Sequence, residues 1–183
     1  MNIILYKIKN ALRWSFIRGW LQTIAANFSV SAFGGVALTS ALSAVLIKAD
    51  GTRFELGILS YRVVTDAFVA FVVDQLQTET SVFGDFKYHD SGVGVTAEAA
   101  ANTTIETTDG EARATGTQTE SAANAYRSVG TISYTTTKAI TEHGLFNDVT
   151  TGTLMDRSVF TAINVVNGDS IQFTYTITFS SGG

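Results

Sequence analysis

Apolar and polar residues alternate strictly near the C-terminus of the chain. Between residues 170 and 180 the apolar positions are Ile171, Phe173, Tyr175, Ile177 and Phe179, with Gln172, Thr174, Thr176 and Thr178 between them. A period of two with one polar face is typical of a strand in an antiparallel sheet. Similar runs at 124–137, 139–146 and 153–160 are separated by turn residues. The pattern predicts a mainly β fold, an antiparallel, jelly-roll-like β-sandwich.

Helical spacing occurs in one short stretch of the chain. Phe68, Phe71, Val72 and Leu76 would share one face of a helix. The spacing predicts a short helix from Asp66, the expected N-terminal cap, to Gln77. We expect this helix to cover one end of a sheet with its apolar face.

The remaining elements are shorter and less regular. An Asp50-Gly51 turn between apolar runs predicts a hairpin of residues 42–48 with residues 53–56. The further strands that we expect are a buried one at 56–65, one at 83–90 and an edge strand at 113–120. Residues 93–123 are rich in Ala, Thr, Gly and Glu, which predicts a long surface loop or a weak pair of strands.

The first 48 residues differ from the rest of the chain. They contain five basic residues and no acidic one, and residues 19–47 carry no charge. This uncharged run has the length of a membrane span, and small residues near Ser40 would suit a cleaved signal, but many polar residues dilute it. The sequence favours an extended or partly helical arm (1–48) before a β-sandwich domain (49–183). The side chains that we expect to contact a partner are Trp14, Phe16, Arg18, Trp20, Phe28 and Phe33.

Composition and charge narrow the classes of partner. The 183 residues are 45% hydrophobic and 15% charged, which fits one folded domain with an arm. The net charge is −4, and because residues 1–48 carry +5, residues 49–183 carry −9. So acidic a domain repels phosphate backbones, and we do not expect it to bind nucleic acid. The arm could contact an anionic surface of a membrane, a nucleic acid or an acidic protein.

Few residues could carry chemistry. The chain has no cysteine, and its two histidines are His89, before Asp90, and His143, after Glu142. Two histidines with a carboxylate could bind a metal, but no close ligand spacing supports this, and histidines hydrogen-bonded at strand ends are favoured. Turn aspartates such as Asp169 lack the spacing of a calcium loop. Hydrolase, phosphate-binding and dinucleotide motifs are absent too, so we expect no enzyme, cofactor or metal.

One ionic interaction can be predicted from the order of the strands. Glu142 and Arg157 fall on adjacent predicted strands, and a cross-strand pair between them is worth about 0–1 kcal/mol if exposed. The apolar side chains that we expect to fill the core around them are Phe146, Leu154, Phe160 and Ile163. Asn167-Gly168-Asp169 would form the turn into the last strand.

Four segments follow one another in a recognisable order. They read FKYHDSG (86–92), AITEHGLF (139–146), TLMDRSVF (153–160) and INVVNGDSIQFTYTITF (163–179). In this order the segments resemble small structural proteins of tailed bacteriophages and prophages, and a looser form of the pattern is similar to domains of phage tail and fibre proteins. The resemblance covers roughly residue 56 to the C-terminus. It implies a structural protein of the virion, assembled in the host cytoplasm.

The resemblance and the arm together favour a non-enzymatic capsid decoration (cement) protein. Its arm would clamp neighbouring subunits of the major capsid protein, and its domain would form a homo-oligomer, with a trimer favoured. The alternative is a tail, baseplate or head-fibre component whose β domain faces outward and binds a receptor or carbohydrate. A third hypothesis is a membrane-anchored or secreted β domain of cellular origin.

Overall fold

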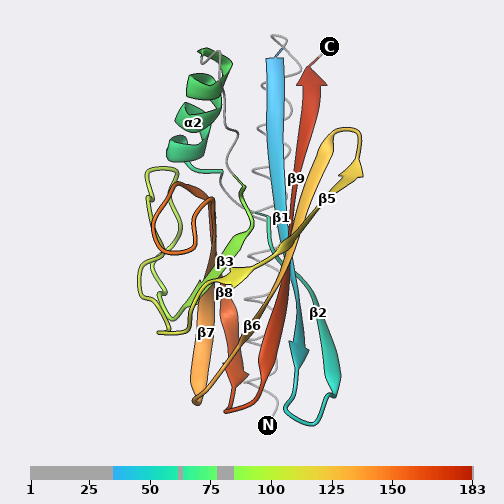
Figure 1. The fold of residues 1–183 in the computed structure, drawn as a ribbon, viewed down its shortest axis with the longest axis vertical. Helices are drawn as coiled ribbons and strands as arrows, with labels where there is room; N and C mark the ends of the chain where they lie inside the picture. Colours follow the sequence, from blue (N-terminus) through green and yellow to red (C-terminus); the bar gives the residue numbers. More distant parts are fainter. Residues whose placement is uncertain (1–34, 62–63, 78–84, 183) are drawn as a thin grey trace, which may run out of the picture.

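Two antiparallel sheets and one helix make up the described part of the chain (Figure 1). The computed structural model describes residues 35–61, 64–77 and 85–182. Sheet A has the strand order β2-β1-β9-β6-β5, and sheet B has the order β4-β3-β7-β8. The strands are β1 (Gly35–Ile47), β2 (Arg53–Ser60), β3 (Tyr88–Gly92), β4 (Ala114–Thr115), β5 (Thr117–Ala122), β6 (Ala125–Ser133), β7 (Lys138–Phe146), β8 (Leu154–Val165) and β9 (Ser170–Gly182). The predicted class, mainly β and antiparallel with one short helix, is confirmed for these residues.

β1 is an inner strand of sheet A and does not belong to an arm. It pairs with β9 along its whole length and with β2 over its second half. Its inward-facing Leu42 and Ala44 are buried in the core. The expected boundary at residue 48 is therefore wrong, because the domain includes the chain from residue 35 onward. Small and polar residues in this strand hide its alternation, which is why the sequence pattern placed it in the arm.

β2 is an exposed edge strand. The predicted hairpin is present, with Gly51 at a φ of +85° in its turn. Residues 53–58 are all exposed, so the expectation of a buried strand beginning at residue 56 is wrong. Two register shifts interrupt the pairing of β2 with β1, and Gly57 has a φ of +69°. Such irregularities twist an edge strand and hinder the addition of a further strand.

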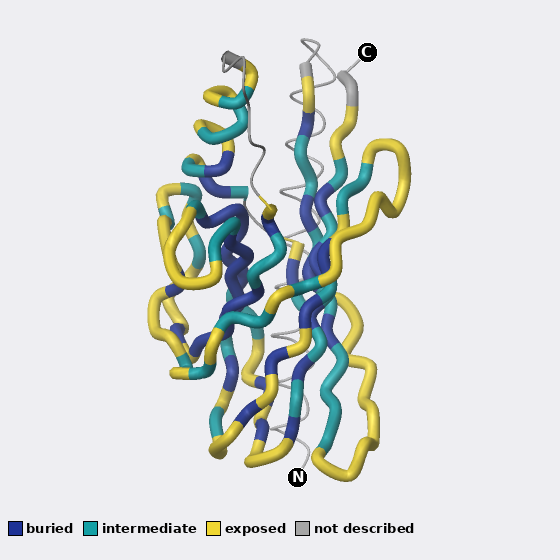
Figure 2. Tube along the Cα trace, in the orientation of Figure 1, coloured by how far each residue is buried: buried dark blue, intermediate teal, exposed yellow. Residues whose placement is uncertain are grey.

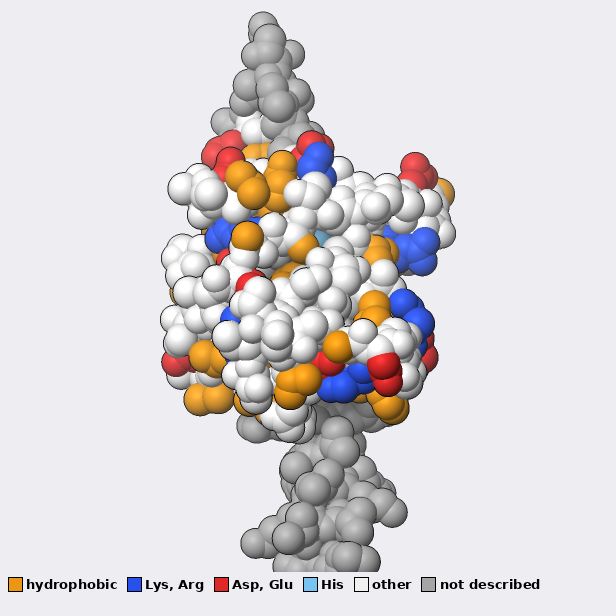
Figure 3. Space-filling model, turned by 60° about the horizontal axis from the view of Figure 1, so that its bottom comes forward, with side chains coloured by type: hydrophobic (Ala, Val, Ile, Leu, Met, Phe, Trp, Pro, Cys, Tyr) orange, Lys and Arg blue, Asp and Glu red, His pale blue; other side chains and the backbone are white. Residues whose placement is uncertain are grey.

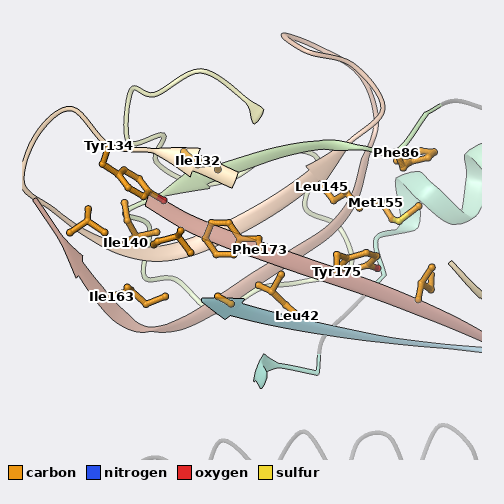
Figure 4. Close-up of a cluster of buried hydrophobic side chains, with 14 of the residues drawn as sticks. Leu42, Phe86, Ile132, Tyr134, Ile140, Leu145, Met155, Ile163, Phe173 and Tyr175 are labelled. Atoms are coloured by element: carbon orange, nitrogen blue, oxygen red, sulfur yellow. The ribbon is translucent and has the colours of Figure 1, made fainter. Parts of the chain in front are cut away.

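The main core lies between the two sheets (Figures 2 and 4). On β9 the predicted alternation is confirmed for four positions that are at most 1% exposed, namely Ile171, Phe173, Tyr175 and Ile177. The fifth, Phe179, is 37% exposed because it lies beyond the facing strands near the end of the sheet. Of the residues expected in the core, three are buried and Phe160 is only partly buried.

The helix α2 (Asp66–Gln77) has the predicted bounds but a different cap. The Oγ1 atom of Thr65 accepts a hydrogen bond from the backbone N–H of Phe68 at 3.2 Å, so Thr65 is the cap and Asp66 is the first helical residue. Phe68 packs edge-to-face on Phe86, with 5.1 Å between ring centroids. Leu76 is 81% exposed, because α2 extends past the end of sheet B (Figure 1). Its predicted place on the buried face is wrong.

The chain between α2 and β6 contributes one inner strand of sheet B, one edge strand of each sheet and a long loop. The strand predicted at 83–90 is seen as β3, which begins at Tyr88. The edge strand predicted at 113–120 is divided into β4 and β5, which lie at the edges of different sheets. Residues 93–113, between β3 and β4, form the predicted long loop, here called loop 93–113. This loop passes over the outward face of sheet B, where its backbone binds Glu142 on β7.

Candidate functional site

The outward face of sheet B carries a buried ion pair. Glu142 on β7 is fully buried and Arg157 on β8 is 2% exposed, and the Nε of Arg157 donates to Oε2 of Glu142 at 2.8 Å. In the register of the two strands, Arg157 lies opposite Gly144, next to Glu142 on the same face. The predicted pair is therefore present, but it is buried and not solvent-exposed. A buried pair responds far more strongly to the loss of one partner than an exposed pair does.

Loop 93–113 covers this ion pair and is bound by it. Glu142 accepts hydrogen bonds from the backbone N–H groups of Gly94, Glu106 and Thr107 at 2.8–2.9 Å. Together with Arg157 these donors supply both oxygens of the carboxylate with two hydrogen bonds each. Arg157 also donates to the carboxylate of Glu106 at 3.2 Å. We call Glu142 and Arg157 the loop clamp, because one buried carboxylate fixes three points of a loop that contributes little apolar surface.

A second group of contacts holds the C-terminal half of loop 93–113. Ile105 is buried in a small cluster with Phe146 and Leu154, on the side of sheet B away from the main core. The guanidinium of Arg113 lies 3.5 Å from the ring centroid of Phe146, and its Nε donates to Asp90 at 2.9 Å. Burial is the main cause that raises the pKa of Asp90, and the bond from Arg113 opposes it. Arg113 thus links the end of the loop to β3 and β7.

The inward face of sheet B brings the two histidines together. His89 Nδ1 and His143 Nε2 lie 2.9 Å apart, and His89 Nε2 lies 2.8 Å from the Oγ of Ser128 on β6 of the opposite sheet. All three residues are fully buried. His143 also packs against Phe173, with 4.6 Å between ring centroids. The prediction of hydrogen-bonded histidines is correct, but they lie in the core between the sheets, because alternation turns both inward.

Ser128, His89 and His143 have the order of a nucleophile, a base and an orienting group. Such a series could activate a serine, but a substrate must reach it. A Cβ atom placed on Gly130 would lie 2.4 Å from the His89 ring, and one on Gly116 would lie 2.8 Å from it. The backbone therefore packs directly on the imidazole and leaves no room for a substrate beside it. The three side chains form a hydrogen-bonded series inside the core.

Asp169 joins two turns at the other end of the molecule. It is fully buried, accepts a hydrogen bond from the Nζ of Lys48, and accepts further bonds from the backbone N–H groups of Ala49 and Val166 at 3.0 Å each. The bond from Lys48 is the main cause that lowers the pKa of Asp169. Asp169 is thus more than a turn residue, since it connects the β8–β9 turn to the turn of the β1–β2 hairpin.

Two of the pockets on the described surface lie beside loop 93–113 and beside α2. One, of about 340 Å³, lies between loop 93–113 and Arg157, and its polar wall includes Asn102 and Glu106. The other, of about 190 Å³, is apolar and lies between α2 and β9, where Phe68, Met155 and Phe179 line it. The guanidinium of Arg157 in the first pocket already has carboxylate partners. It therefore presents no unpaired charge to a ligand.

Other predicted features lie elsewhere or are not brought together. The arm residues Trp14, Phe16, Arg18, Trp20, Phe28 and Phe33 lie outside the described residues. In the part of the chain that the structure describes, no cluster of three or more His, Asp or Glu side chains is placed to hold a metal ion. Over the same ranges no helix has the length and apolarity needed to cross a membrane.

Sequence reasoning missed the partners that complete these groups. Ser128, Arg113 and Lys48 each bond to a residue more than 20 positions away in the sequence. To predict these partners, one would need to know which residues of non-consecutive segments lie side by side. A single sequence does not give that information. Comparison of the chain with protein-family models, with curated proteins and with solved structures gave no match.

Proposed function

We propose that this chain is a non-enzymatic structural protein of a bacteriophage virion, and specifically a decoration protein that binds the shell of the major capsid protein. The observation that carries the proposal is how polar and apolar groups are distributed in the described residues. The groups most suited to chemistry, His89, His143, Glu142 and Arg157, bond to one another inside the fold. Several large apolar side chains, in contrast, remain on the surface. Such a surface suits contact with other proteins rather than catalysis.

Six of the thirteen exposed large apolar residues in the described ranges lie on two elements, three on β2 and three on α2. On β2, Phe54 and Ile58 are 49% and 51% exposed, and on α2, Val73 and Leu76 are 48% and 81% exposed. On the face drawn in Figure 3, apolar side chains form small groups among polar atoms. Small apolar groups of this kind suit several modest contacts with neighbouring subunits, each of which adds to the area buried on assembly. The irregular edge of β2 favours contact through side chains over strand pairing.

The uneven distribution of charge along the chain supports an orientation in which the N-terminal segment faces the shell and the domain faces outward. Residues 1–34 carry four basic residues and no acidic one, so residues 35–183 have a net charge of −8. We propose that the aromatic and basic residues of this N-terminal segment bind neighbouring capsid subunits, while the acidic domain faces outward and forms a trimer with its copies. The outward acidic surface would limit adhesion of particles to one another and to DNA.

A binding experiment with purified shells tests this proposal. Shells that lack the protein are mixed with the full chain, sedimented, and analysed for bound protein. The Trp14→Ala/Trp20→Ala variant should lose at least tenfold in affinity, whereas Val149→Ala, which shortens an exposed apolar side chain on the domain, should bind normally. Failure of the unmodified chain to sediment with the shells would contradict the proposal. Equal binding by both variants would contradict the role of the N-terminal segment.

A further inference from the structure

The histidine pair lies at a hydrogen-bonded contact between the two sheets. His89 on β3 and His143 on β7 belong to sheet B, and Ser128 on β6 belongs to sheet A. Because alternation turns these side chains inward, the hydrogen-bonded series runs across the core from one sheet to the other. The chain has two histidines in total, and both are in this pair.

The hydrogen-bond geometry accepts only one hydrogen between the two rings. His89 Nδ1 and His143 Nε2 face each other at 2.9 Å, so one nitrogen must donate and the other must accept. If both rings were protonated, two N–H groups would point at one another and the bond would be lost. The remaining nitrogen of His143, Nδ1, is buried and has no hydrogen-bond partner. A proton placed there would therefore also lack an acceptor.

The surroundings offer little to balance a positive charge. Against His89 lie Ser128, Gly130 and Gly116. Against His143 lie Phe173 on β9 and, in the strand register, Ser158 on β8 and Ser91 on β3.

Ionisable groups from the neighbouring elements already have partners. Asp156, on the same face of β8, accepts hydrogen bonds from Ser40 and Ser158 and lies near Tyr175. The hydroxyl of Tyr134 and the carboxylate of Asp109 bond to Ser91 on β3. Asp90 and Glu142, adjacent in sequence to the histidines, lie on the opposite face of sheet B and bind Arg113 and Arg157.

We propose that the His89–His143 pair is an acid-sensitive latch between the two sheets. At neutral pH the neutral rings connect β7, β3 and β6. As the pH falls below the ordinary histidine pKa of about 6.5, proton binding favours an opened form in which the His89 ring leaves its packing against Gly116 and Gly130. The reason is that a charged ring would otherwise lie between the sheets without a further acceptor or a counter-charge. This proposal does not depend on the protein being a capsid component.

The pKa values of both histidines support the direction of the effect. Burial lowers the pKa of His89 to about 3, and burial together with the nearby His89 lowers the pKa of His143 well below its ordinary value. The unfolded chain binds these protons near pH 6.5 and the folded chain does not, so stability is complete above that pH and falls as the pH decreases. Each histidine should lower the folded-to-unfolded ratio by roughly 25-fold between pH 7 and pH 5.

The test is the pH dependence of urea unfolding of the full chain between pH 7 and pH 5. No other histidine titrates in this window, and burial raises the pKa of Asp90, which makes its contribution opposite in sign. We expect the folded-to-unfolded ratio of the unmodified chain to fall by roughly several hundredfold, because the effects of the two histidines multiply. His89→Leu/His143→Leu, which fills the same space with apolar groups, should remain folded and lose most of this dependence. A flat profile for the unmodified chain, or an equal slope in the variant, would overturn the proposal.

A second measurement keeps the test valid if the double variant does not fold. The ring protons of the two histidines are followed by NMR in the unmodified chain, together with amide exchange corrected for the intrinsic effect of pH. We expect no titration near pH 6.5 in the folded state, and faster exchange in residues 114–117 and 125–133 at pH 5. Ordinary titration near pH 6.5 without a change in exchange would show accessible histidines and overturn the latch.

Discussion

Arg157 donates from Nε to Oε2 of Glu142 at 2.8 Å beneath a loop whose backbone binds the same carboxylate. Ile105 packs this loop on an apolar cluster, and hydrogen bonds to the buried carboxylate of Glu142 hold three of its backbone N–H groups. The pair is stabilising only as a complete unit, because either charge alone would be buried without a partner. For this reason the clamp gives the sharpest predictions about stability.

Glu142→Gln should reduce the free energy of unfolding by about 3–5 kcal/mol. The amide keeps the shape of the carboxylate, but its NH₂ group would face N–H donors and leave Arg157 with a weaker partner. Urea unfolding at pH 7 measures the change. Glu55→Gln, at an exposed position of β2, is the matched control and should change stability by less than about 0.5 kcal/mol. A loss below about 1 kcal/mol for Glu142→Gln would contradict the clamp.

Gly92→Ala should loosen the loop without removing any polar group. An added Cβ would lie 2.3 Å from the carbonyl oxygen of Thr107 and 2.6 Å from Oε1 of Glu142, so the backbone of the loop must move. We expect a loss of about 1–3 kcal/mol and faster amide exchange in loop 93–113. Val93→Ala, at the neighbouring exposed position, should leave exchange in the loop unchanged. Unchanged exchange in Gly92→Ala would show that the loop is not held as described.

Asp169→Asn should remove part of the pH dependence of the free energy of unfolding. The pKa of Asp169 is lowered in the folded state, so the carboxylate stabilises the protein above its ordinary pKa and loses this effect as the pH falls. The variant should therefore be less stable at pH 7, and the difference from the unmodified chain should shrink below about pH 4. Urea unfolding of both proteins at pH 7 and at pH 3 measures this difference in stability. A constant difference at both pH values would disprove the role of the ionised carboxylate.

Phe54→Ser and Leu76→Ser should affect assembly more than folding. Both side chains are exposed, so each change should alter the free energy of unfolding by less than about 1 kcal/mol. If these residues contact neighbouring subunits, the paired variant should bind shells at least tenfold more weakly, while Val149→Ser binds normally. Sedimentation with shells measures binding. Normal binding by the paired variant would remove β2 and α2 from the contact surface.

The elements that the sequence predicts correctly are those in which the local pattern and the tertiary structure agree. The alternation of β9, the hairpin at Gly51 and the bounds of α2 depend on short-range rules, and all three are present. Pairing of Glu142 with Arg157 was also predictable, because the two strands follow one another. Its burial was not, since it depends on loop 93–113, whose composition gives no sign of where the loop packs.

The errors have a common physical cause. The predicted arm extends too far along the chain because the small and polar side chains of β1 suit a central strand only when β9 and β2 lie beside it. Helical spacing identifies the face that Leu76 shares with Phe68 but not where the neighbouring sheet ends. The meeting of His89, His143 and Ser128 likewise depends on the packing of one sheet on the other, which no local pattern contains.

The number of copies of this chain per purified phage particle tests the proposed function most directly. Quantitative mass spectrometry would compare its peptides with those of the major capsid protein in the same sample. For a decoration protein we expect copies in a fixed ratio to the major capsid protein, on the scale of the whole shell. A few copies per particle would move the protein to the tail, the baseplate or a head fibre and contradict the decoration role. Absence from particles would contradict the virion proposal itself.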